Sequence, residues 1–147
     1  MSKKNKITFS LITLLLLGGL YIYFEFCNYT DIDIDIDKVS TEIKTSSKNL
    51  TASFIRNEKN ANSIYKDKII EVEGVVKEVT FLNKRNTVIL YGNNKNSGVL
   101  CDMQSNQIME IKKLVKGQNI VLKGVCKGFL KDAILLNCML INQQSNE

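Results

Sequence analysis

The sequence predicts a mainly β protein: one small domain of five strands, with a short helix between the third and fourth, preceded by two helices. Three observations support this class. From Lys68 onward apolar residues recur at every second position, which is the period of a strand. Residues 39–66 instead show the period of an amphipathic helix. Residues 7–26 are almost entirely uncharged, as expected of a membrane-spanning helix.

The apolar segment from Ile7 to Phe24 contains no charged residue, and as a helix it would be roughly 27 Å long, close to the thickness of a bilayer core. Three lysines lie in residues 1–6, and acidic residues follow Phe24. Because positive charge stays on the cytoplasmic side, we expect a cytoplasmic tail (1–6), an anchor (7–26) and a periplasmic C-terminal domain in a bacterial cytoplasmic membrane.

A cleaved signal peptide or a lipoprotein signal is the alternative to this anchor. Both require small residues directly before the cleavage site, whereas Phe24, Glu25 and Phe26 precede Cys27. The sequence therefore favours an uncleaved anchor, with cleaved export or lipidation left open.

Residues 27–38 form an acidic juxtamembrane segment in which Asp and Ile alternate strictly from Asp31 to Asp37. We expect an extended, solvated linker, because four like charges on one face repel one another. An added strand and a cation site are the alternatives, although a calcium loop requires a turn with a glycine. In residues 39–66 the apolar positions predict one amphipathic helix capped by Ser40 or Thr41 and packed on the domain, with partner binding as the alternative.

The predicted domain spans residues 67–142, and residues 143–147 form a tail. Its first strand is long, and its apolar phase shifts between Val76 and Val79, which predicts a bulge. Turns at residues 82–86 and 92–98 separate the second strand (87–91) and the third strand (99–103).

A short helical spacing from Ile108 to Val115 follows the third strand and ends at Gly117. The fourth strand has Ile120, Leu122, Gly124 and Cys126 on one face and Lys123 on the other, and residues 127–132 turn. The fifth strand has Ile134, Leu136, Cys138 and Leu140 on one face. Three strands, a helix and two strands are the layout of the five-stranded OB-fold Greek-key barrel.

Several different short motifs follow one another along residues 50–142. Tyr65-Lys66-Asp67-Lys68 precedes the first strand, and Lys116-Gly117 precedes the fourth strand. With residues 121–128 and Leu135-Leu136-Asn137-Cys138, this pattern resembles the tRNA_anti-like family of exported bacterial OB-fold proteins. The resemblance implies the fold and a location in the envelope, but no reaction. Many relatives carry a lipoprotein signal, from which residues 24–26 depart.

The four cysteines lack the Cys-x-x-Cys spacing of a zinc site, so no metal site is expected. Cys126 and Cys138 share the core-facing phase of consecutive strands, and a hairpin centred on Asp132 would place them opposite each other. Cys101 also faces the core. In an oxidising compartment these three are disulfide candidates. Buried free thiols and, less favoured, a reactive thiol are the alternatives.

OB-folds bind ligands across their second and third strands and the flanking loops. Basic and aromatic residues fall at these places, where rings could stack on bases or sugars and cations could meet anions. The candidate ligand-binding residues are Lys84, Arg85, Tyr91, Lys95, Lys127, Phe129 and Lys131. The alternative is that they are ordinary solvated loop residues.

No catalytic pattern is evident: the chain has no histidine, no glycine-rich phosphate loop and no nucleophile motif. We therefore expect no enzymatic activity and no cofactor. A net charge of +5 is modest for a nucleic-acid binder, so nucleic acid is not the expected partner. The leading hypothesis is protein interaction or scaffolding in the envelope. The alternative is binding of an anionic polymer: an oligosaccharide, a lipid headgroup or a single-stranded nucleic acid.

Overall fold

The computed structural model describes residues 12–23, 36, 38–82 and 85–141 in two compact units, Met1–Asp33 and Ile34–Glu147. The predictions for the basic tail and the C-terminal tail lie outside these residues, as does that for the linker of residues 27–38 except at 36 and 38. Ile36 is fully buried and clusters with Ile69 and Val125, so the expectation of a solvated linker is wrong at this position.

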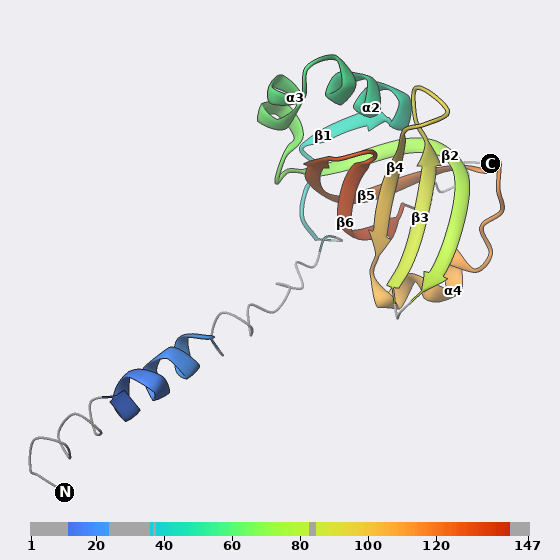
Figure 1. Ribbon diagram of the computed structural model, residues 1–147. Helices are drawn as coiled ribbons and strands as arrows, with labels where there is room; N and C mark the ends of the chain where they lie inside the picture. The colour runs from blue at the N-terminus through green and yellow to red at the C-terminus, as the bar shows by residue number, and fades with distance from the viewer. Residues whose placement is uncertain (1–11, 24–35, 37, 83–84, 142–147) are drawn as a thin grey trace, which may run out of the picture. The chain divides into compact units, whose positions relative to one another are not determined.

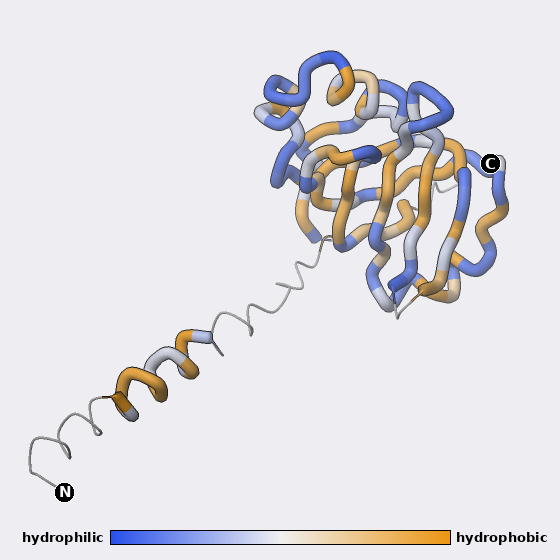
Figure 2. Tube along the Cα trace, viewed as in Figure 1, coloured by the Kyte–Doolittle hydropathy of each residue, from blue (hydrophilic) through white to orange (hydrophobic). Residues whose placement is uncertain are grey.

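The first unit contains a helix of residues 12–23, whose largely apolar side chains are exposed (Figure 2). Within the residues that the structure describes, none of the helices is both long enough and apolar enough to span a bilayer. Because the apolar segment continues beyond both ends of the described helix, the anchor of residues 7–26 stays a prediction.

The second unit is built around a closed barrel of five strands, which confirms the predicted OB-fold layout (Figure 1). The sheet order β2-β3-β4-β6-β5 is closed by pairing of β5 with β2, and β4 and β6 are parallel. The barrel strands are β2 (Ile69–Leu82), β3 (Arg85–Tyr91), β4 (Gly98–Met103), β5 (Asn119–Phe129) and β6 (Ala133–Leu140).

The long strand β2 serves both sides of the barrel. Its first half, from Ile69 to Val75, pairs with β5, and its second half, from Val76 onward, pairs with β3. The register shifts between Val76 and Glu78, at the bulge that the change of apolar phase predicts. A bulge bends a strand and increases its twist, which lets one strand close the barrel.

The single helix predicted over residues 39–66 is wrong. The structure has a strand there, β1 (Ile43–Ser46), parallel to β2, and then two helices, α2 (Ser47–Arg56) and α3 (Glu58–Tyr65). Local caps set where the two helices begin. The Ser46 side chain accepts a hydrogen bond from the Asn49 amide at 3.1 Å and caps α2, and the extended Asn57 both ends α2 and caps α3.

The short helix predicted between the third and fourth barrel strands is present as α4 (Ile108–Ile111), and the 3-10 turn η1 (Ser105–Gln107), which was not predicted, precedes it. The helix ends before Val115, which is exposed, and Gly117 adopts a positive φ of 92° in the turn before β5.

The hairpin of β5 and β6 differs from its prediction. Strand β5 continues through Phe129, so the turn is limited to residues 130–132. On β6, Ala133 and Leu135 face the core, whereas Ile134 and Leu136 face outward. Asn137 has a left-handed φ of 54°, which changes the phase and returns Cys138 to the interior. A strict period of two cannot predict this change.

Candidate binding surfaces

An apolar row crosses the outer face of three barrel strands. Ile89 on β3 pairs with Leu100 on β4, and Leu100 pairs with Ile134 on β6. Paired residues point to the same side of a sheet, and the neighbours Val88 and Cys101 are buried inside, so this row faces outward. All three residues of the row are half-buried. We call Ile89, Leu100 and Ile134 the apolar row.

Acidic side chains lie beside the apolar row. Glu78 on β2 pairs with Ile89 and is exposed, and Asp102 is the next outward residue after Leu100 on β4. Arg85, at the start of β3, is the single cation of β3 and β4. Lys77 of β2 lies at the other end of β3, with its Nζ 6.0 Å from the centroid of the Tyr91 ring. The face at which OB-folds bind their ligands therefore has an apolar centre flanked by carboxylates, with one cation near each end of β3.

The structure does not gather the predicted ligand-binding residues into one site. Arg85 and Tyr91 lie at opposite ends of β3, about 20 Å apart. Lys95 and Lys131 lie in loops at the Tyr91 end, because β4 and β6 begin side by side there. Lys84 lies outside the described residues.

Two of the predicted ligand-binding residues, Phe129 and Lys127, form interactions within the fold. The Phe129 ring stacks on Phe54 of α2, with centroids 5.4 Å apart and planes 9° apart, so at least one face of the ring is engaged in packing. Lys127 forms an ion pair of 2.9 Å with Asp67, and this bond is the main cause that lowers the pKa of the Asp67 carboxyl.

A polar cleft of about 640 Å³ opens where the start of α2, the middle of β2 and the loop between β3 and β4 meet. Tyr91 and Lys95 line it, together with Ser47, Lys48 and Asn93, which the sequence reasoning missed. The segment Gly92–Gly98 was predicted to be only a turn. Nothing in the sequence brings it beside α2, but in the structure the Asn93 amide donates to Thr51 Oγ1 at 2.8 Å.

The three described cysteines lie together in the core as free thiols. The expectation that Cys126 lies opposite Cys138 is wrong, because two register shifts in the β5–β6 pair place Leu135 opposite Cys126. Burial is the main cause that raises the pKa of the Cys138 thiol, and the interaction with Cys101 raises it further. Cys101 Sγ itself lies 3.9 Å from the Val99 carbonyl oxygen. A disulfide within the trio stays a prediction.

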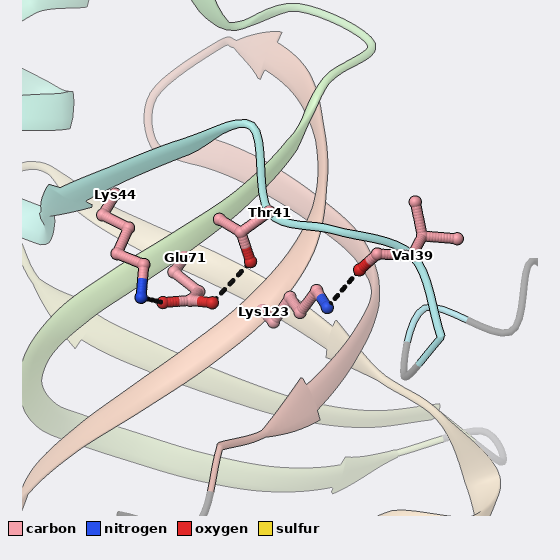
Figure 3. Close-up of polar contacts among 5 residues, drawn as sticks. All are labelled: Val39, Thr41, Lys44, Glu71 and Lys123. Atoms are coloured by element: carbon pink, nitrogen blue, oxygen red, sulfur yellow. Dashed lines mark hydrogen bonds and ion pairs between the residues drawn. The ribbon is translucent and has the colours of Figure 1, made fainter.

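A segment before β1 covers the outer face of the β2–β5 pair (Figure 3). We call residues 39–42 the strap. Lys123 on β5, predicted to face outward, does so but is only 7% exposed, because the strap covers it and its Nζ donates to the Val39 carbonyl at 2.5 Å. The Thr41 hydroxyl donates to Glu71, which also pairs with Lys44 at 2.9 Å.

The strap should make stability depend on acid pH. The pKa of Glu71 is lowered chiefly by the Thr41 hydrogen bond, with Lys44 and Lys123 contributing. Its stabilising effect is therefore complete above the ordinary glutamate pKa of about 4.3 and is lost as pH falls through the lowered value.

We expect wild type to be more stable than Glu71→Gln by about 1 kcal/mol at pH 7, with the difference shrinking on acidification below pH 4. Urea unfolding at each pH measures this difference, and Glu78→Gln, which alters an exposed β2 carboxylate away from the strap, is the control. A difference between wild type and Glu71→Gln that stays constant down to pH 2 would show that the carboxylate charge is not what holds the strap.

The closed five-stranded barrel with a short helix between its third and fourth strands defines an OB-fold protein. The chain belongs to the tRNA_anti-like family, whose model matches residues 1–140. A comparison with curated protein sequences gave no match.

One solved structure shares the fold at low sequence identity, and others are less similar. A candidate nucleic acid-binding lipoprotein from Klebsiella pneumoniae is 16% identical, covers 67% of this chain and 92% of its own, and has a TM-score of 0.55. The OBody AM3L09 bound to hen egg-white lysozyme is 11% identical, with 54% and 86% covered and a TM-score of 0.43. Asparaginyl-tRNA synthetase from Entamoeba histolytica is 11% identical, with 52% and 21% covered and a TM-score of 0.40. The description of the Klebsiella pneumoniae protein as nucleic acid-binding does not fit the prediction that nucleic acid is not the partner of this chain.

Proposed function

We propose that this chain is a membrane-tethered, envelope-facing OB-fold module that binds a protein partner through the apolar row and has no enzymatic activity. The observation that carries the proposal is the register of Ile89, Leu100 and Ile134 across three strands. Three adjacent apolar side chains can lose their contact with water together when a partner binds over them. The centres of protein–protein interfaces consist of such apolar, fully desolvated patches.

The charges around the row favour a protein over a polyanion. Glu78 and Asp102 lie directly beside the row and would repel phosphates or uronates laid across it. The two cations of this face, Arg85 and Lys77, lie instead near the two ends of β3. A protein with apolar side chains and a basic rim would complement both features.

The proposed tether is supported by the charge pattern of the N-terminal segment. Lysines at residues 3, 4 and 6 precede the uncharged stretch, and acids follow it. This asymmetry favours a domain outside the cytoplasm. There the partner would be an envelope protein.

The test is photo-crosslinking in intact cells of the native host, with the photoreactive residue at position 89. We expect Leu100→Lys to reduce capture of the partner by about tenfold or more, because it places a charge in the centre of the apolar row. Val115→Lys changes an exposed apolar residue beyond α4 and serves as the matched control. Equal capture by wild type and Leu100→Lys would overturn the proposed interface.

Two further measurements separate the other parts of the proposal. Labelling of the domain's lysines by a membrane-impermeant reagent on intact cells is expected, and labelling only after lysis would contradict the envelope location. Salt-dependent binding of single-stranded nucleic acid or an acidic polysaccharide that Leu100→Lys strengthens would replace the protein partner with the anionic-polymer alternative.

A further inference from the structure

We propose that the polar cleft binds a small sugar-like molecule: a hydroxylated ring that carries one carboxylate or phosphate. The cleft is separate from the apolar row and does not depend on the proposed function. Its volume of about 640 Å³ is in the range of small-molecule sites, which have a few convergent polar groups in a concave surface.

The floor of the cleft is the first turn of α2 above Gly74. Ser47 is only 2% exposed, and no other described residue is hydrogen-bonded to its hydroxyl. Its Oγ lies so close to Gly74 that a β-carbon there would meet it at 2.5 Å, so glycine opens this part of the floor. None of the buried side-chain N or O atoms in the described residues lacks a hydrogen-bond partner, so the Ser47 hydroxyl must reach the solvent of the cleft that it lines. There it is available to hydrogen-bond a ligand hydroxyl or anion.

The helix start adds donors and positive potential to the floor. Ser46 caps α2 through the Asn49 amide, which leaves the amides of Ser47 and Lys48 at the start of the helix without an intrahelical partner. Such a position favours an anionic group, and the lone hydroxyl of Ser47 lies beside it.

The charges of the cleft also favour an anion. Lys48 of α2 and Lys95 of the loop between β3 and β4 both line it, and neither forms an ion pair within the described part of the chain. The one carboxylate of the lining, Glu73, accepts a hydrogen bond from Asn119 Nδ2 at 2.8 Å. Two lysines therefore face one carboxylate that is already hydrogen-bonded.

The remaining wall suits a hydroxylated ring better than a bare ion. Tyr91 is the single aromatic residue of the lining, and an aromatic ring offers an apolar surface to the C–H face of a sugar. Asn94 Oδ1 already accepts from the Asn96 and Ser97 amides, at 2.9 and 2.8 Å, which fixes the loop. No hydrogen bond to the described residues uses the Asn94 side-chain NH2, which can donate to ligand oxygens.

The test is an NMR titration of the ¹⁵N-labelled full-length chain with glucuronate, glucose 6-phosphate, glucose and inorganic phosphate in turn. We expect the two charged sugars to shift the amides of Ser47 and Asn93 at concentrations about tenfold lower than glucose or phosphate alone, because only they engage both parts of the cleft. Comparison of the two charged sugars shows which anion the cleft prefers.

The double variant Lys48→Gln/Lys95→Gln should weaken this binding by about tenfold or more, whereas Lys116→Gln, an exposed lysine outside the cleft, should leave it unchanged. Binding of glucose as tight as that of glucuronate would overturn the anionic class. Phosphate binding as tight as that of glucose 6-phosphate would overturn the sugar class. If none of the four probes shifts these amides, the cleft is not the site proposed.

Discussion

Replacement of Phe54 by alanine is expected to destabilise the domain by about 3–5 kcal/mol, the range for removal of a fully buried aromatic side chain. Phe54 is 2% exposed and connects α2 to the barrel. Its ring stacks on Phe129 of β5 and lies 6.0 Å from the ring of Tyr65 at the end of α3. Loss of the ring therefore removes the contact that holds both helices on the end of the barrel.

Urea unfolding of the full-length chain measures this loss, and Ile55→Ala is the matched control because it changes the next residue of the same helix, which is 50% exposed. We expect less than about 1 kcal/mol for the control. Phe129→Ala should also destabilise, since its ring packs on Phe54. A Phe129→Ala variant of unchanged stability would return Phe129 to the set of candidate ligand contacts.

The barrel could be predicted from the sequence because each strand has a local signal. Alternating apolar residues mark five strands, the phase change near Val76 marks the bulge, and Gly117 marks the turn after the short helix. These features depend on neighbouring residues alone, so a single sequence contains them. The order of these elements, three strands, a helix and two strands, is that of the OB-fold and is compatible with few other topologies.

The prediction failed where a long-range contact overrides the local pattern. Residues 39–66 have a helical apolar spacing throughout, but Ile43–Ser46 gains hydrogen bonds by pairing with β2, which no local signal reports. Likewise Phe129 has the spacing of a loop residue, and only the approach of α2 shows that its ring is packed. Tertiary context decides both cases.

The binding surfaces were harder to predict than the fold, for the same reason. The apolar row needs Ile134 to face outward, whereas strict alternation with Cys138 placed it inside, and the left-handed Asn137 makes the difference. The polar cleft joins three segments distant in sequence, at Ser47, Gly74 and Asn93. Only Tyr91 and Lys95 of its lining were among the predicted ligand contacts, through the general position of OB-fold loops.

Introduction of a β-carbon at Gly124 has the second largest expected effect. Gly124 lies on β5 without a positive φ, so its backbone accepts alanine, but the added carbon would meet Cys138 Sγ at 2.5 Å and the Leu136 carbonyl at 3.2 Å. Both neighbours are in the tightly packed hairpin, so Gly124→Ala should cost about 1–3 kcal/mol by overpacking.

A double-mutant cycle with Cys138→Ala identifies the cause. Cys138→Ala removes the sulfur that the new carbon would meet, and by itself it should cost about 1–2 kcal/mol through the cavity that it leaves. In the double variant the alanine carbon at position 124 occupies that space, so we expect the combined loss to be smaller than the sum of the single losses by about 1 kcal/mol or more. Chemical unfolding under reducing conditions measures all four proteins. Strictly additive losses would mean that the Cys138 thiol does not fill the space above Gly124, and that the glycine is required by the Leu136 carbonyl alone.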